Sequence, residues 1–167
     1  ALIDHQRYPT REAFDQDLAG AIDSAHPDLV VLAGFMRILT PEFVARFSER
    51  LMNIHPSLLP LYPGLHNHQR ALDNGDSHAG ATVHYVTGEL DGGPPVLQAK
   101  VPVISGDDAD ALAARVLAVE HQIYPVAINW HLCGRLTWED GSLIKDGMPV
   151  PPLSLIHISE PTRQLQI

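Results

Sequence analysis

The sequence is short of cysteine, of basic residues and of long apolar runs, and each shortage excludes a class of protein. Its 167 residues include one cysteine, Cys133, so neither an internal disulfide nor a thiolate metal cluster can form. Only 11 Lys and Arg residues accompany 20 Asp and Glu, for a formal net charge of -9. Nucleic acid is therefore not an expected partner, because phosphate neutralisation needs clustered positive charge. No apolar stretch reaches the roughly 18 residues of a membrane span. These absences predict a cytoplasmic protein that binds small molecules and no membrane.

The first third of the sequence predicts helices alternating with short strands. Thr10 can cap a helix whose apolar residues recur at helical spacing until Pro27 closes it. The apolar run 28–34 is typical of a strand covered on both faces of a parallel sheet. A Thr-Pro-Glu start predicts a second helix over about 40–49, and a strand follows at 51–55.

The middle of the sequence predicts a long loop and a hairpin. Residues 56–79 are rich in Pro, Gly, His and Asn, so we expect a loop that acts as a lid. Residues 82–87 and 96–103 have the pattern of two paired strands around a turn.

A long helix should follow the hairpin. Asp107 and Asp108 offer its cap, and it is expected to run through His121, to break at Pro125 and to continue over 126–133. Alternating strands and helices of this kind predict the α/β class with a Rossmann-like open, mostly parallel sheet.

Asn53, His55 and Asp91 form the most informative constellation. Positions i and i+2 of a strand face one side, so Asn53 and His55 should project together where the strand ends, at the edge where α/β folds bind ligands. An amide N–H can hold an oxyanion, an imidazole can move a proton, and a carboxylate such as Asp91 can orient the ring. Each is ordinary alone, and together they suit acyl transfer without a covalent intermediate.

Other constellations are weaker. Four histidines lie close in sequence, namely His66, His68, His78 and His84. No further ligand at a defined spacing accompanies them, so no metal is expected. Ser57 lacks the Gly-x-Ser-x-Gly turn of a hydrolase nucleophile. Gly92 and Gly93 precede prolines and predict a turn, not a phosphate-binding loop.

Four motifs resemble those of one enzyme family. VLAGFMRIL at 31–39, NIHPSLLP at 53–60, YPGLH at 62–66 and ELDGGP at 89–94 are similar to the phosphoribosylglycinamide formyltransferases, folate-dependent enzymes of purine synthesis. The resemblance covers roughly residues 1–150. It implies the formyltransferase fold, 10-formyltetrahydrofolate as co-substrate, glycinamide ribonucleotide as formyl acceptor and no metal.

The resemblance also implies roles for individual residues. It assigns catalysis to Asn53, His55 and Asp91. Folate binding is assigned to Arg11, Met36, Arg37, Ile38, Leu39, Asn53, Val86 and Thr87. The ribonucleotide is assigned to Gly34 and Glu120, where the alternative for Glu120 is a solvated helix acid. The loop around His66 is expected to order over the folate.

Two residues and both ends of the chain depart from the family pattern. Asn67 replaces an expected small hydroxyl residue and Gly88 an expected acid, and neither is expected to touch the catalytic residues. Family members begin with a strand and a Gly-rich phosphate-binding loop, so residues 1–152 are expected to be a formyltransferase domain lacking that amino-terminal part and its first strands. Such a chain should be marginally stable and nearly inactive. Residues 153–167 resemble the translation of a sequencing-library adapter, so they are expected to be a non-native tail. The alternative is a genuine terminal strand.

Three other functions remain as alternatives. A formyltetrahydrofolate deformylase would pass the formyl group to water, and a methionyl-tRNA formyltransferase would need a basic extra domain. A non-catalytic folate-binding module would keep the pocket without the chemistry. A homodimer is left open.

Overall fold

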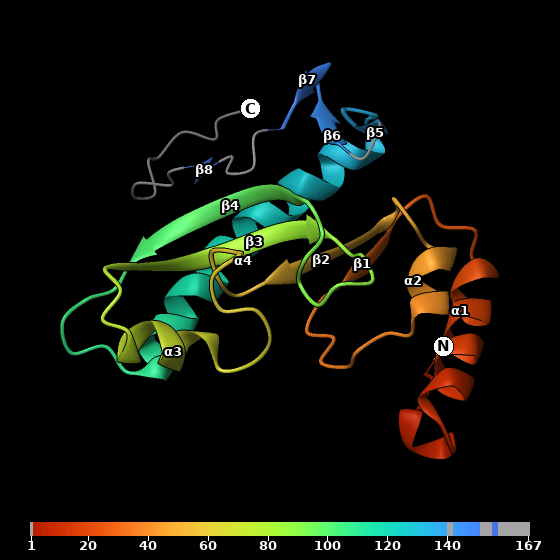
Figure 1. Ribbon diagram of the computed structural model, residues 1–167, viewed down its shortest axis with the longest axis horizontal. Helices are drawn as coiled ribbons and strands as arrows, with labels where there is room; N and C mark the ends of the chain where they lie inside the picture. The colour runs from red at the N-terminus through yellow and green to blue at the C-terminus, as the bar shows by residue number, and fades with distance from the viewer. Residues whose placement is uncertain (1, 140–141, 151–154, 157–167) are drawn as a thin grey trace.

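The computed structural model describes residues 2–139, 142–150 and 155–156 (Figure 1). The helices are a short 3-10 turn at His5–Arg7, α1 (Arg11–Asp23), α2 (Pro41–Arg46), α3 (Asn67–Asp73) and α4 (Ala109–Leu132). The strands are β1 (Val30–Leu32), β2 (Leu51–His55), β3 (His78–Tyr85), β4 (Pro95–Pro102), β5 (Leu136–Glu139), β6 (Ser142–Lys145), β7 (Met148–Pro149) and β8 (Leu155–Ile156).

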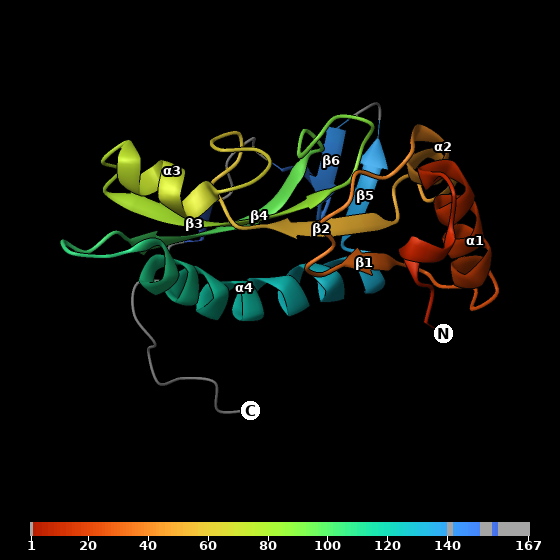
Figure 2. The same cartoon turned by 90° about the horizontal axis from the view of Figure 1, so that it is seen from below.

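The strands form two sheets of unequal size. The larger has the order β1-β2-β3-β4-β8, and the smaller is an antiparallel sheet of order β5-β6-β7. In the larger sheet β1 runs parallel to β2, whereas β3 is antiparallel to both β2 and β4. Figure 2 shows α4 along one face of this sheet, α3 with its loop on the other, and α1 and α2 together at one end. The predicted Rossmann-like α/β class is confirmed, with a mixed sheet.

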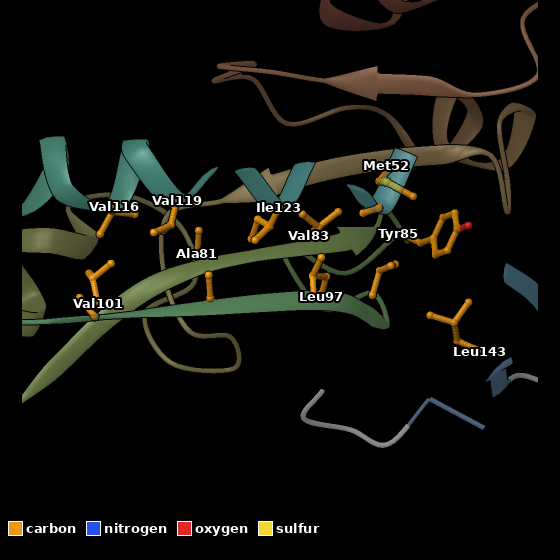
Figure 3. Packing of buried hydrophobic residues seen from close by; sticks show 14 of the residues in the cluster. Met52, Ala81, Val83, Tyr85, Leu97, Val101, Val116, Val119, Ile123 and Leu143 are labelled. Carbon is orange, nitrogen blue, oxygen red and sulfur yellow. The ribbon is translucent and has the colours of Figure 1, made fainter. Parts of the chain in front are cut away.

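Alternation along β3 separates an apolar face from a polar one. Its odd-numbered residues, such as Val83 and Tyr85, are buried against α4 together with Leu97 of β4 (Figure 3). The α4 side of this core consists of Leu112, Val116, Val119, Ile123 and Ala127. Each large aliphatic side chain buried in this way stabilises the fold by about 1.5–3 kcal/mol. The even-numbered residues Thr82 and His84 lie on the opposite face.

A second apolar cluster joins α1 and α2 to the edge of the sheet. Phe43 and Phe47 pack there on Leu51, with ring centroids 4.9 Å apart. The buried Asp15 of α1 accepts a 2.7 Å hydrogen bond from the Thr40 backbone N–H. This bond fixes the start of α2, and with it the end of the preceding loop, relative to α1.

The predicted helix starts are confirmed by their capping bonds. The side chain of Thr10 accepts from Ala13 N and that of Thr40 from Phe43 N, at 3.2 and 3.3 Å. Asp108 accepts from the Ala111 N–H at 2.8 Å. Such caps satisfy backbone donors that the first helical turn leaves free.

Several predicted boundaries were wrong. Helix α1 ends at Asp23, before Pro27, and α2 ends at Arg46, ahead of 49. Strand β1 is shorter than the run 28–34, and its central residue Val31 is 44% exposed, so it is not covered on both faces. These ends depend on packing at the edge of the sheet, which a local apolar run does not report.

The predicted break at Pro125 was also wrong, because α4 continues through it. Proline removes one backbone hydrogen bond and costs about 3 kcal/mol within a helix. Ile123 and Ala127, on either side of it, are fully buried against the sheet and offset this cost. The Tyr124 hydroxyl also donates to Leu32 O at 2.8 Å and to Met52 O at 3.0 Å, which holds the helix across β1 and β2.

Three further segments differ from the sequence prediction. The expected loop 56–79 contains α3, and β3 begins at His78, four residues before the predicted strand. The sheet β5-β6-β7 was not predicted at all. The predicted tail 153–167 lies outside the described residues, except that β8 pairs in parallel with β4. Among the residues that the structure describes, no helix is long and apolar enough to cross a membrane.

The turn between β3 and β4 requires glycine at position 93. A Cβ on Gly93 would lie 1.8 Å from the Tyr85 carbonyl oxygen. Replacing Gly93 with alanine is therefore expected to force the turn away from β3 and to lower the free energy of unfolding by about 3 kcal/mol, measured by urea denaturation. Gly88→Ala is the matched control, because a Cβ there meets nothing within 4 Å. Equal losses in the two variants would contradict this account of the turn.

The corner between β4 and α4 is held by an ion pair that predicts a pH dependence. Arg115 donates to both carboxylate oxygens of Asp107, at 2.7 and 2.9 Å, and with the Ile104 N–H lowers the pKa of Asp107 from 3.8 to about 2. Because the folded-state pKa is depressed, the pair stabilises the fold above pH 3.8 and this contribution is lost as the pH falls towards 2. Asp107→Asn should therefore be less stable than wild type at pH 7, and the gap should narrow between pH 4 and 2 in urea unfolding.

Asp110→Asn is the control for this measurement. Asp110 is an exposed acid in the first turn of the same helix, and its replacement is expected to leave the pH dependence of wild type unchanged. A constant gap between Asp107→Asn and wild type across this range would refute the role of the ion pair.

Candidate active site

The pairing of β2 with β3 places a row of polar side chains on the face opposite α4. Asn53 lies directly across from His84, and His55 across from Thr82. Since cross-strand partners project from the same face, these four side chains form one patch. His55, Thr82 and His84 are buried, at 6%, 0% and 2% exposure, and Asn53 is half-buried. The predicted neighbourhood of Asn53 and His55 at the end of a strand is present.

Asp91 reaches this patch from the turn between β3 and β4. It has a φ of 51° in that turn, and its Oδ2 lies 3.4 Å from His55 Nδ1. Its other oxygen lies 3.8 Å from His84 Nε2. The backbone N–H of Gly64 donates to Asp91 Oδ2 at 2.8 Å, so a second loop holds the carboxylate in place.

His55 is held on both ring nitrogens. Its Nε2 lies 3.0 Å from the Tyr62 carbonyl oxygen and 3.0 Å from Asn67 Nδ2. Nδ1 faces Asp91, so each nitrogen has an oxygen acceptor beside it. A ring that carries protons on both nitrogens satisfies both acceptors.

His84 is in the opposite situation. Burial lowers the pKa of His84, more than the Tyr85 carbonyl and Asp91 raise it, so the ring stays neutral at physiological pH. Its Nδ1 lies 2.9 Å from the Tyr85 carbonyl, which fixes the proton on Nδ1. Nε2 is then an acceptor, and it receives the Asn53 amide N–H at 3.3 Å. One of the two amide hydrogens of Asn53 is thereby fixed, and the other is left for a ligand.

The loop that covers the patch is tied to the sheet by Thr82. The Thr82 hydroxyl donates to Ser57 O at 2.7 Å and accepts from the Leu59 N–H at 3.0 Å. Gln98, the cross-strand partner of Thr82, donates to the same hydroxyl and to Leu59 O, both at 2.8 Å. These buried bonds anchor the segment after His55 over the face of the sheet.

Asn67 was predicted to lie clear of the catalytic residues, and this prediction was wrong. The side chain is 7% exposed and its Nδ2 contacts His55 Nε2. It also donates to the carbonyls of Tyr62 and Gly64, the latter at 3.0 Å. Asn67 is the first residue of α3, and the loop before that helix folds back onto the end of β2. The sequence pattern treated this segment as an unstructured lid and so missed the contact.

Two of the predicted folate residues, Leu39 and Val86, pack against the apolar cluster that joins α1 and α2 to the sheet. The Arg37 guanidinium lies over the Phe14 ring, 5.1 Å from its centroid. Met36 and Ile38 are 80% and 62% exposed, and their side chains are available to a ligand.

The remaining predicted residues are more scattered. Arg11 is the exposed first residue of α1, 3.9 Å from Glu12, and nothing links it to Asn53 or His55 in the part of the chain described. The Thr87 hydroxyl accepts from the Glu89 N–H at 3.4 Å, in the turn that carries Asp91. Gly34, with a φ of 63°, lies two residues after the end of β1.

Glu120 lies half-buried on α4 and within electrostatic reach of His55. Burial raises the pKa of Glu120, and the charges of His121 and His55 oppose this effect. The alternative of a fully solvated helix acid does not fit this environment. Glu120 stands on α4, which covers the face of the sheet opposite the patch, so its contact with the ribonucleotide stays a prediction.

The four histidines singled out in the sequence do not converge. His84 belongs to the patch, His66 precedes α3 with a φ of 59°, and His78 Nδ1 lies 2.9 Å from the Ser77 hydroxyl. Burial, with His55 nearby, lowers the pKa of His68. Across residues 2–139, 142–150 and 155–156, no group of three or more His, Cys, Asp or Glu side chains is arranged to hold a metal ion.

Sequence reasoning did not assign His84 or Asn67 to the site. His84 could have been identified from strand pairing. It lies two residues after Thr82 and therefore on the same face of β3, and the register with β2 places it across from Asn53. No local signal identifies Asn67, since its contact with His55 depends on the path of the loop. The patch as assembled brings together the Asn53 amide, the His55 imidazole and the Asp91 carboxylate.

Comparison with known proteins agrees with this site. The profile of the Formyl transferase family matches residues 1–128. The chain is 56% identical to phosphoribosylglycinamide formyltransferase of Escherichia coli (strain K12) over 145 residues, covering 87% of this chain and 68% of that protein. The Haemophilus influenzae enzyme of the same name is 47% identical over 151 residues, 90% of this chain and 71% of that one.

A solved structure gives the same result. That of phosphoribosylglycinamide formyltransferase from Coxiella burnetii superposes with a TM-score of 0.85 at 44% identity, covering 90% of this chain and 71% of that one. The fold, the matched profile and these identities together show that the chain belongs to the formyl transferase family, among the phosphoribosylglycinamide formyltransferases.

Proposed function

We propose that this protein transfers the formyl group of 10-formyltetrahydrofolate to the amine of glycinamide ribonucleotide, with catalysis by Asn53, His55 and Asp91. The observation that carries this proposal is the 3.4 Å approach of Asp91 Oδ2 to His55 Nδ1, on the face where Asn53 projects. The relatives from E. coli and H. influenzae bear the name of this activity.

The reaction begins with attack of the amine nitrogen on the formyl carbon. A carbon–nitrogen bond forms and the carbonyl electrons move onto oxygen, which gives a tetrahedral centre with an oxyanion. The amide hydrogen of Asn53 that does not bind His84 can donate to this oxyanion. Because His84 is a fixed acceptor, the amide needs no reorientation as the charge develops.

Collapse of the tetrahedral centre transfers the formyl group. The bond between the formyl carbon and N10 of the folate breaks, N10 gains a proton, and the former amine loses one. The His55 imidazole is suited to carry this proton, because it lies on the same face as Asn53 and can exist with one or two ring protons. Asp91 holds the ring in orientation and stabilises its charged form.

The two substrates are proposed to contact different residues around this centre. The folate is proposed to lie against the 36–39 segment, with its exposed Met36 and Ile38 side chains, and against Arg11, Val86 and Thr87. Gly34 and Glu120 are proposed to contact the ribonucleotide, and the loop around His66 to lie over the folate. We further infer that residues 1–152 form the formyltransferase domain and that it works in the cytoplasm.

The primary test follows formyl release from 10-formyltetrahydrofolate with and without glycinamide ribonucleotide. Release that depends on the ribonucleotide supports the transferase. Release without it would replace this proposal by a deformylase. Folate binding without release in either condition would mean a binding module.

His55→Ala and Asp91→Asn are expected to lower kcat by about 10²- to 10⁴-fold, because proton transfer and the orientation of the ring are lost. Folate affinity, measured by fluorescence titration of a folate analogue, should stay close to that of wild type. His78→Ala is the matched control, since this exposed histidine at the start of β3 contacts only its neighbour Ser77 among the hydrogen bonds described. Turnover retained in both active-site variants would reject the assigned roles.

Asn53→Asp is expected to lower kcat by about 10²- to 10³-fold, because a carboxylate cannot donate to the oxyanion and repels its charge. The Michaelis constants should change much less, since the lost bond forms only in the transition state. Asn129→Asp, an exposed change of the same kind on α4, controls for the added charge. An equal loss in both variants would argue against an oxyanion contact by Asn53.

A further inference from the structure

We propose that Asn67 is a positioning residue for His55: its amide is the hydrogen-bond donor that allows the buried imidazole to give up its Nε2 proton. The inference rests on the proposed function only in what the proton is used for. The geometry that supports it concerns His55 and the loop alone.

Without Asn67, His55 would face acceptors on both sides. The Asp91 carboxylate lies 3.4 Å from Nδ1, and the Tyr62 carbonyl oxygen lies 3.0 Å from Nε2. An acceptor beside an unprotonated ring nitrogen sets lone pair against lone pair. In a side chain only 6% exposed, such an unpaired contact is costly. Such a ring would be held in its doubly protonated form and would be a poor proton carrier.

Asn67 changes this balance because its amide sits among three acceptors. Nδ2 donates to the Tyr62 carbonyl, lies 3.0 Å from Gly64 O and lies 3.0 Å from His55 Nε2. The two acceptor carbonyls identify this atom as the nitrogen of the amide. When His55 carries a proton on Nε2, that N–H donates a hydrogen bond to the Tyr62 carbonyl oxygen. When the proton leaves, one amide hydrogen of Asn67 can turn to Nε2, and the neutral ring keeps its remaining proton on Nδ1 towards Asp91.

The same loop fixes the carboxylate. Gly64, whose carbonyl accepts from Asn67, donates its own N–H to Asp91 Oδ2 at 2.8 Å. Asn67 therefore holds the backbone that positions Asp91 while it contacts His55 directly. Its burial at the start of α3 supports the role of a fixed contact.

Other titratable groups also act on His55 and are constant across the test. Asp91 faces it from the β3–β4 turn, and His84 lies beyond that carboxylate on β3. His68 on α3 and Glu120 on α4 interact with it electrostatically. None of these is replaced in the variants below, so a shift between variants reports the change at residue 67.

The first measurement uses the unaltered protein and needs no activity. Nitrogen-15 NMR of the histidine rings, with the His55 signals identified by their loss in His55→Gln, gives both the titration midpoint and the tautomer of the neutral ring. We expect the neutral ring to carry its proton on Nδ1, as an Asn67 donor at Nε2 requires. A neutral ring protonated on Nε2 would overturn the proposal.

The variants then test the donor itself. Asn67→Ala removes it, and the His55 midpoint should rise by about half to one pH unit, the size of one hydrogen bond. Asn67→Asp puts an acceptor with negative charge beside Nε2, and the rise should be about one unit or more. Asn67→Thr keeps a hydroxyl that can donate, so its midpoint should stay close to that of wild type. Midpoints that do not move in Asn67→Ala and Asn67→Asp, or a rise in Asn67→Thr equal to that in Asn67→Ala, would overturn the proposal.

Gln69→Ala is the control for changes in α3. Its amide donates to Asp73 on the exposed side of the helix, so its loss should leave the His55 midpoint unchanged. Should Asn67→Ala or Asn67→Asp fail to fold by circular dichroism, Asn67→Thr and the tautomer in wild type still decide the question.

Kinetics separate this proposal from the proposed function. If the protein transfers formyl groups, the acid limb of kcat/KM against pH should move upward in Asn67→Ala by the same amount as the NMR midpoint. A midpoint that rises in a protein with no transferase activity would uphold the role of Asn67 while rejecting the function. Transferase activity in Asn67→Ala with an unchanged His55 midpoint and an unchanged acid limb would uphold the function and reject the role of Asn67.

Discussion

The register between β2 and β3 is the constraint on which the site depends. It sets Asn53 across from His84 and His55 across from Thr82, while Met52 and Val83 face α4. A slip of one residue would turn these polar side chains into the apolar core and expose the residues that pack on the helix. The cost of burying unpaired imidazole and amide groups therefore favours this register, so the same pairing stabilises the fold and assembles the catalytic face.

Hydrogen bonds to the sheet turn the covering segments into part of the site. The loop after His55 is bound through Thr82 and Gln98, and the 62–67 segment is bound through Asn67. The β3–β4 turn approaches closely because Gly93 has no side chain, and it delivers Asp91. Catalytic residues thus come from a strand and a turn, and the loop between them fixes their separation.

The sequence predicted what local chemistry determines and failed where distant packing decides. Helices begin where Thr10, Thr40 and Asp108 can cap them, and β2 has its predicted bounds, because both signals lie within a few residues. Pro125 did not end α4, since burial on both sides of it outweighed a lost hydrogen bond. Asn53, His55 and Asp91 were proposed from motifs. His84 and Asn67 were not, because their contacts arise only from strand pairing and the path of a loop.

Two neighbouring histidines have different properties because their surroundings differ. His84 is buried with one nitrogen donating to a carbonyl, and burial lowers its pKa, so it serves as a neutral acceptor for Asn53. His55 has an oxygen acceptor at each nitrogen and one amide donor, so it can exist with or without its second proton. Environments that separate two identical side chains in this way mark a division of roles. One ring orients the amide that would bind the oxyanion, and the other is left to move the proton.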